Sequence, residues 1–183
     1  MSLTFRLHVP CDIQHTELVE EFIRFTTKSL FLKEDSKQSQ LCTAINEIFT
    51  NIIIHSQTAR KDQIVRFQVD IGRKSIAISV FDNGPGFEIE HQLPPYRKNL
   101  IGYKKELKRV IDGRVMLTVL DTKTIGFTFE EEAYHFLDRN AILKTLDGHG
   151  LGISIITKIM DSLNYKYLGK GKFDWQMVKQ IVH

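Results

Sequence analysis

Residues 46–55 read NEIFTNIIIH and place an acid, an amide and an imidazole in an otherwise apolar segment. Glu47, Asn51 and His55 follow one another at four-residue intervals, so in a helix their side chains lie along one face. Such a stripe either faces a ligand or faces solvent. The other positions form an apolar face that we expect to pack on a sheet, namely Ile45, Ile48, Phe49, Ile52 and Ile53.

A glycine-containing segment, DNGPGF at residues 82–87, follows a predicted strand. A loop at a strand end can face a ligand while the sheet holds it in place. There, Asp82 could accept a hydrogen bond from an exocyclic amine such as that of adenine. Gly84 and Gly86 allow backbone angles and close approaches that other residues do not. A simple β-turn would also use Asn-Gly and Pro-Gly, so this segment does not decide the function alone.

A second glycine-rich segment, GHGLG at residues 148–152, stands directly before a predicted apolar helix. Free backbone amides at a helix N-terminus and the helix dipole both favour a phosphate group. A glycine-rich loop leading into a buried helix is the alternative. The segment is not a Walker loop, because no Gly-Lys-Ser/Thr follows, and its spacing does not fit a Rossmann fold.

The order of these three segments resembles the N-box, G1-box and G2-box of the GHKL ATPase superfamily. That superfamily includes gyrases, heat-shock chaperones, mismatch-repair ATPases and sensor histidine kinases. The resemblance covers most of the chain outside residues 88–147 and implies one domain over residues 1–183. The implied fold is an α/β two-layer sandwich, in which helices cover one face of a mixed, mostly antiparallel sheet and ATP lies between the helices and a lid.

The resemblance also implies a role for each motif residue. Asn51 would bind Mg2+ through its amide oxygen, and Asp82 would bind the adenine amine of ATP or ADP. Glu47 would be the general base, and His55 could donate a hydrogen bond near the phosphates or simply pack at the helix end. The other residues implied in nucleotide binding are Gly84, Gly86, Gly148, His149, Gly150, Leu151 and Gly152.

Among the members of the superfamily, the chain most resembles the anti-sigma factor serine kinases, by its compact size, its first strand and the sequence EIFTNIIIH. Those kinases phosphorylate a serine or threonine of a small antagonist protein, and many sequester a sigma factor. The resemblance therefore implies a partner-switching Ser/Thr protein kinase, with an anti-anti-sigma-like antagonist and a sigma factor as candidate partners and a homodimer allowed. A non-catalytic ATP or ADP sensor and the catalytic domain of a histidine-kinase-like protein are the alternatives.

Residues 88–147 depart from the anti-sigma kinases, in which the two glycine boxes are close together. We expect an insertion at the ATP lid, with a basic amphipathic helix at Leu100–Ile111 that faces an acidic protein partner; a decorative surface extension is the alternative. Arg114–Leu120 and Thr124–Phe129 are predicted to form a hairpin, and Glu130–Leu146 a helix. The basic residues are Arg97, Lys98, Lys104, Lys105, Lys108 and Arg109.

Hydrophobic periodicity and turn residues predict the remaining elements. Strands are expected at Leu3–Val9, Ile64–Ile71, Ser75–Phe81, Tyr165–Leu168 and Trp175–Val182, and helices at Asp12–Leu32, Ser36–Ser56 and Ile153–Leu163.

Composition predicts a cytoplasmic protein with no membrane partner. Hydrophobic residues make up 42%, no apolar run reaches the roughly 18 residues of a membrane span, and the N-terminus has no signal-peptide pattern. Cys11 and Cys42 have no metal-ligand spacing. The net charge of +3 does not favour nucleic acid, and few aromatic residues accompany the basic cluster beyond Tyr96 and Tyr103.

Overall fold

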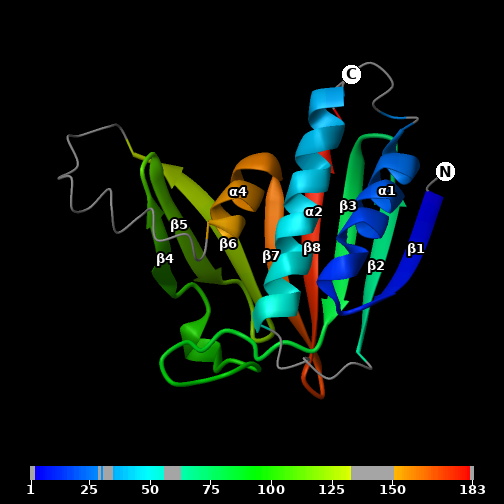
Figure 1. The fold of residues 1–183 in the computed structure, drawn as a ribbon. Helices are drawn as coiled ribbons and strands as arrows, with labels where there is room; N and C mark the ends of the chain where they lie inside the picture. Colours follow the sequence, from blue (N-terminus) through cyan, green and yellow to red (C-terminus); the bar gives the residue numbers. More distant parts are fainter. Residues whose placement is uncertain (1–2, 29, 31–34, 56–62, 133–150, 182–183) are drawn as a thin grey trace.

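The computed structural model describes residues 3–28, 30, 35–55, 63–132 and 151–181. Within them one eight-stranded sheet runs in the order β1-β2-β3-β8-β7-β6-β5-β4 (Figure 1). The α/β class is confirmed, but every pairing of these strands is antiparallel, so the expected mixed sheet is wrong in that respect. The strands are β1 (Leu3–Pro10), β2 (Ile64–Ile71), β3 (Ser75–Asp82), β4 (Lys104–Val110), β5 (Gly113–Val119), β6 (Thr124–Glu131), β7 (Ser162–Gly169) and β8 (Lys172–Gln180).

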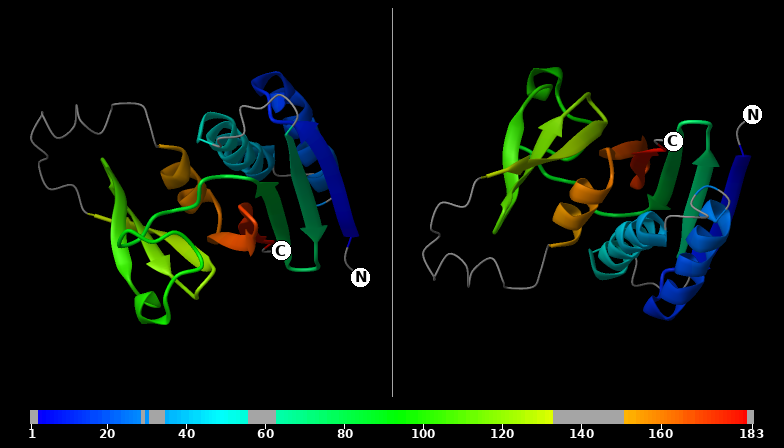
Figure 2. Two further views of the ribbon diagram at one scale, coloured as in Figure 1. Left: turned by 90° about the horizontal axis from the view of Figure 1, so that it is seen from below. Right: turned by 90° about the horizontal axis from the view of Figure 1, so that it is seen from above.

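Three α-helices of the described chain lie on the same face of this sheet, as Figure 2 shows: α1 (Thr16–Thr27), α2 (Asp35–His55) and α4 (Gly152–Ile159). Two short 3-10 helices, η1 (Ile13–His15) and η2 (Lys98–Leu100), stand outside this layer. The helix layer exists because each helix has an apolar face to bury. On α2 that face is the predicted one: Ile45, Ile48, Phe49 and Ile52 are buried, and Ile53 is partly buried. No helix in the described residues is both long and apolar enough to cross a membrane.

Strand periodicity decides which side chains meet these helices. In β2 and β3 every second residue is buried, because successive side chains of a strand point to opposite faces. In β3 the buried series runs Ile76, Ile78, Val80 and ends at Asp82. The carboxylate of Asp82 therefore stands on the helix side of the sheet, at the very end of an otherwise apolar row.

Strands β4, β5 and β6 come from the long segment after the first glycine box and extend the sheet beyond β7. Val115, Leu117 and Val119 of β5 are buried, so this part contributes to the main core. The predicted hairpin is confirmed, but the predicted helix at Leu100–Ile111 is wrong. Antiparallel pairing of β4 with β5 overrides the helix preference of its Lys, Glu and Leu residues.

Several predicted helix boundaries also move. Asp12 caps η1 by accepting a hydrogen bond from the Gln14 N–H at 3.0 Å, and α1 ends at Thr27 rather than near Leu32. Helix α4 ends at Ile159, because residues 162–163 already pair with β8. Of the helix predicted at Glu130–Leu146, Glu130 and Glu131 belong to β6, and residues 133–146 lie outside the described chain.

Candidate functional site

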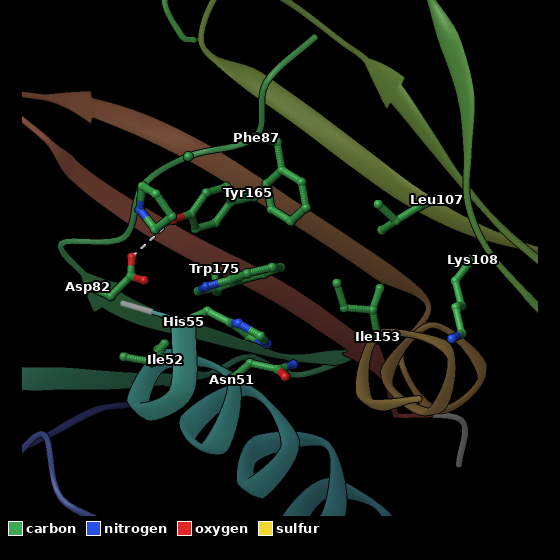
Figure 3. A pocket seen from close by; sticks show the side chains of 12 residues that line it. Asn51, Ile52, His55, Asp82, Phe87, Leu107, Lys108, Ile153, Tyr165 and Trp175 are labelled. Atoms are coloured by element: carbon green, nitrogen blue, oxygen red, sulfur yellow. Dashed lines mark hydrogen bonds between the residues drawn. The ribbon is translucent and has the colours of Figure 1, made fainter. Parts of the chain in front are cut away.

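A cavity of about 410 Å3 lies between α2, α4 and the sheet (Figure 3). Its volume falls in the range that small-molecule sites occupy, and most of its lining is apolar and aromatic. The residues that line it are Asn51, Ile52, His55, Asp82, Pro85, Gly86, Phe87, Leu107, Lys108, Ile153, Tyr165 and Trp175.

Helix α2 supplies the polar stripe predicted from the sequence. Asn51 is half-buried and His55 is exposed at the helix end, and both line the cavity. Glu47 lies one turn earlier, half-buried, beside the start of α4. The four-residue spacing thus brings the amide and the imidazole to one cavity wall and the acid beside the start of α4, while the opposite face of the helix is buried in the core.

Asp82 marks one end of the cavity (Figure 3). Its side chain is buried, and this burial raises the pKa of Asp82 to about 6 against the opposing effect of a hydrogen bond from the Gly84 backbone. The Tyr165 hydroxyl also donates to the carboxylate, at 3.4 Å, and the nearby Asp174 raises the pKa further. A buried acceptor that faces a cavity is suited to bind an exocyclic amine of a ligand.

The two glycines after Asp82 are required by close packing. A Cβ atom at Gly84 would lie 2.6 Å from the Tyr165 hydroxyl oxygen and 2.8 Å from Asp82 Oδ2. Gly86 has φ +77°, and a Cβ there would lie 2.9 Å from the Phe173 ring. Both positions keep the loop pressed against the cavity wall, in agreement with the predicted use of glycine for close approach.

The start of α4 packs directly against α2. A Cβ atom at Gly152 would lie 2.6 Å from Glu47 Oε2 and 3.1 Å from Asn51 Nδ2. Leu151 is the N-cap residue of α4, and Ile153, the second residue of the helix, lines the cavity. The predicted residues Gly148, His149 and Gly150 lie outside the described residues. Two of the three motifs, and the described end of the third, therefore meet around one cavity.

A family model of the histidine kinase-like ATPase domain matches residues 14–178, nearly the whole chain. The chain belongs to the histidine kinase-like ATPase family. An ATPase domain of this family binds ATP or ADP, and the cavity lined by Asn51, His55 and Asp82 is where we expect the nucleotide.

Curated relatives of this ATPase domain include anti-sigma F factors. The chain is 32% identical over 94 residues to the anti-sigma F factor of Clostridium botulinum strain Alaska E43, which covers 51% of this chain and 62% of that protein. It is 33% identical over 107 residues to that of Clostridium perfringens strain SM101, which covers 56% of this chain and 74% of that protein. The chain thus spans about three fifths of the length of the C. botulinum relative.

Sequence reasoning missed the aromatic wall of the ATPase domain's cavity. Tyr165 and Trp175 pack with ring centroids 4.3 Å apart, and Phe87 lies edge-on to both, at 5.5 and 6.1 Å. These rings come from β7, β8 and the loop after Asp82, so their meeting depends on the pairing of distant strands. Alternation in β7 and β8 could have placed Tyr165 and Trp175 on one face, but not beside Asp82.

The predicted basic cluster does not form one surface on the ATPase domain. Arg109 is ion-paired with Glu106 and Glu132, whereas Lys108, its neighbour in sequence, lines the cavity. Because the two side chains point to opposite sides of the sheet, the cluster is not the single partner-facing surface that the sequence suggested. Neither Leu107 nor Lys108 was predicted as a cavity residue.

Proposed function

We propose that this ATPase domain is a protein kinase of the anti-sigma factor type. It transfers the γ-phosphoryl group of ATP to a serine or threonine of a small antagonist protein in a partner-switching system. The observation that carries the proposal is the contact of α4 with α2, where Gly152 leaves room for the side chains of Glu47 and Asn51. An acid and an amide thus stand together beside the start of α4, and of the two Asn51 lines the cavity (Figure 3).

Each side chain has a role that fits its position. Asp82 accepts a hydrogen bond from the adenine amine, with Tyr165 and Trp175 beside the base. Glu47 accepts the proton of the attacking hydroxyl, because its carboxylate is near the first turn of α4. His55, exposed at the end of α2, can donate a hydrogen bond to a phosphate oxygen. In-line transfer then depends mainly on positioning and on neutralising charge.

A magnesium ion fits this arrangement when it arrives with the nucleotide. The described residues contain no group of three or more His, Cys, Asp or Glu side chains that could hold a metal alone. Mg2+ bound with ATP needs only one or two protein oxygens beside phosphates and water, and the Asn51 amide at the cavity wall can supply one. The ion would neutralise the charge of the transferred phosphoryl group.

A phosphotransfer assay tests the proposed function. The whole chain is incubated with Mg2+ and ATP labelled on the γ-phosphate, together with small candidate antagonist proteins in native form and with Ser and Thr replaced by Ala. We expect acid-stable label on one antagonist. Glu47→Gln should bind ATP like the wild type but transfer at least 100-fold more slowly, as expected for loss of a general base. Glu131→Gln, an exposed acid on β6, is the matched control.

Three outcomes would refute the proposal. If the wild type binds ATP but labels no protein, the domain is a nucleotide sensor. If the label is acid-labile and lies on histidine, the domain is of the histidine-kinase type. Equal transfer by wild type and Glu47→Gln would show that Glu47 is not the base.

We also propose that two copies of the chain associate through α1 and β1. In the described sheet β1 is a terminal strand, so its outer edge can pair with the same edge of a second copy. Leu18 and Phe25 of the adjacent α1 are 45% and 74% exposed. Sedimentation should show a dimer that Phe25→Glu dissociates and the control Leu120→Glu does not; a monomeric wild type would refute the dimer.

A further inference from the structure

Lys108 reaches the nucleotide cavity because β4 contains a β-bulge. Glu106 pairs with Met116 and Lys108 with Val115, so Leu107 is an extra residue in the strand. A bulge places two residues opposite one and changes which side chains face each side of the sheet. Val115 is buried on the helix side, and Leu107 and Lys108 both line the cavity.

The bulge also separates Lys108 from the charged residues on the opposite face. Arg109 and Arg114 are paired across the strands and form ion pairs with Glu106, Glu130 and Glu132. In a regular strand that starts from the same Glu106, Lys108 would lie on that acidic face. The extra residue therefore turns the Lys108 side chain toward the cavity.

Within the cavity, Lys108 stands at the end away from Asp82. Asp82 lies on β3 and Lys108 on β4, and these strands are separated in the sheet by β8, β7, β6 and β5. Figure 3 shows Lys108 extending toward α4 beside Ile153. Ile153 belongs to the first turn of α4 and lines the same cavity as Lys108.

These positions match the charge distribution of a nucleoside polyphosphate. A base that binds at Asp82 must extend its phosphates toward Asn51 and the start of α4, and so toward Lys108. Among the described residues that line the cavity, Lys108 is the one lysine or arginine. A lysine ammonium is a compact charge that suits the outer oxygens of a phosphate chain.

We propose that Lys108 binds the outer phosphates of the nucleotide and sets the preference for ATP over AMP and adenosine. This inference rests on the proposed placement of the nucleotide. It gives β4–β6 a direct role at the reaction site: the added strands supply a phosphate-binding cation that the three motifs themselves do not contain.

The single tryptophan of the chain provides the test, because Trp175 lines the cavity and its fluorescence should respond to nucleotide. ATP, ADP, AMP and adenosine are titrated into wild type, Lys108→Met, Lys108→Gln and Lys108→Arg. The matched control is Lys105→Met, which lies on the same strand, is exposed and does not line the cavity.

We expect Lys108→Met and Lys108→Gln to raise the Kd of ATP at least tenfold at low salt, which is about 1.4 kcal/mol. The Kd of adenosine should change less than twofold, Lys108→Arg should keep most of the ATP affinity, and Lys105→Met should match wild type. Added salt should weaken ATP binding more in wild type than in Lys108→Met, because a charge pair is screened.

Two results would overturn the role of Lys108 and leave the nucleotide site intact. One is unchanged ATP affinity in both neutral variants. The other is an equal loss for ATP and adenosine, which would mean that Lys108 shapes the cavity without contacting phosphate. If wild type itself binds no ATP, the proposed function fails together with this inference.

Discussion

Asp82→Asn should gain stability relative to the nucleotide-free wild type as the pH rises, while it replaces the carboxylate acceptor proposed for adenine. Burial raises the pKa of Asp82 from an ordinary value of 3.8 to about 6, so the folded protein holds this proton more tightly than the unfolded chain. The group therefore stabilises the fold below pH 4, and this stabilisation is lost as the pH rises through 6. An asparagine in its place has no charge to bury at any pH.

The size of the effect follows from the two pKa values. A shift of about two pKa units corresponds to roughly 3 kcal/mol, expressed fully above pH 7. The new amide can keep the hydrogen bonds from Gly84 and Tyr165 on its oxygen, but its NH2 group needs a partner and costs about 1–3 kcal/mol if it finds none. This packing cost does not depend on pH. The free energy of unfolding of Asp82→Asn relative to wild type should therefore be about 2–3 kcal/mol higher at pH 8 than at pH 4.

Urea unfolding of nucleotide-free wild type and Asp82→Asn, from pH 4 to pH 8, measures this difference directly. The free energy of unfolding of the variant should gain on that of wild type as the pH rises. Asp121→Asn is a control that should change in the opposite direction. Burial tends to raise the pKa of Asp121, but hydrogen bonds from Lys123 and Thr124 lower it overall, so this variant should lose stability relative to wild type as the pH rises. A pH-independent difference for Asp82→Asn, or a variant that loses stability relative to wild type as the pH rises, would refute the reasoning.

Two glycine substitutions test the packing around the site. Gly152→Ala places a Cβ 2.6 Å from Glu47 Oε2. Because the end of a glutamate side chain can move, we expect the variant to fold, but its rate of phosphotransfer should fall at least tenfold, which is about 1.4 kcal/mol. An unchanged rate would contradict the role of this contact. Gly84→Ala places a Cβ 2.6 Å from the Tyr165 hydroxyl and 2.8 Å from Asp82. It should lower the free energy of unfolding, measured in urea, by about 1–3 kcal/mol and should weaken ATP binding. If neither quantity changes, the loop can shift without loss.

The parts of the site that come from one continuous segment were predictable. Helix α2 carries Asn51 and His55 to one wall because helical spacing alone sets their face. Strand β3 likewise carries Asp82 to the helix side by simple alternation. Both patterns are local, so the residues alone determine them once the element type is known.

The missed features depend on pairing between distant segments. Residues 104–110 have the composition of a basic helix, and only their pairing with β5 makes them a strand. The orientation of Lys108 follows from a bulge, which one extra residue creates and which periodicity does not reveal. The raised pKa of Asp82 likewise depends on burial and on Tyr165, which is 83 positions away in sequence.

The three added strands also change how the long segment between the glycine boxes can be tested. Removing residues 95–140 would remove buried core residues such as Leu117, Ile125 and Phe127, and would expose the edge of β7. Loss of function after that deletion would therefore reflect lost folding. Point substitutions of cavity residues such as Lys108 are the informative alternative.

Photolabelling with 8-azido-ATP tests most directly whether the cavity is the nucleotide site. The azide sits on the base, so peptide mapping by mass spectrometry reports where the base lies. We expect adducts on the aromatic wall at Phe87, Tyr165 or Trp175, and their loss when unmodified ATP competes. Adducts confined to the opposite face of the sheet, or labelling that ATP does not reduce, would contradict the assignment of this cavity.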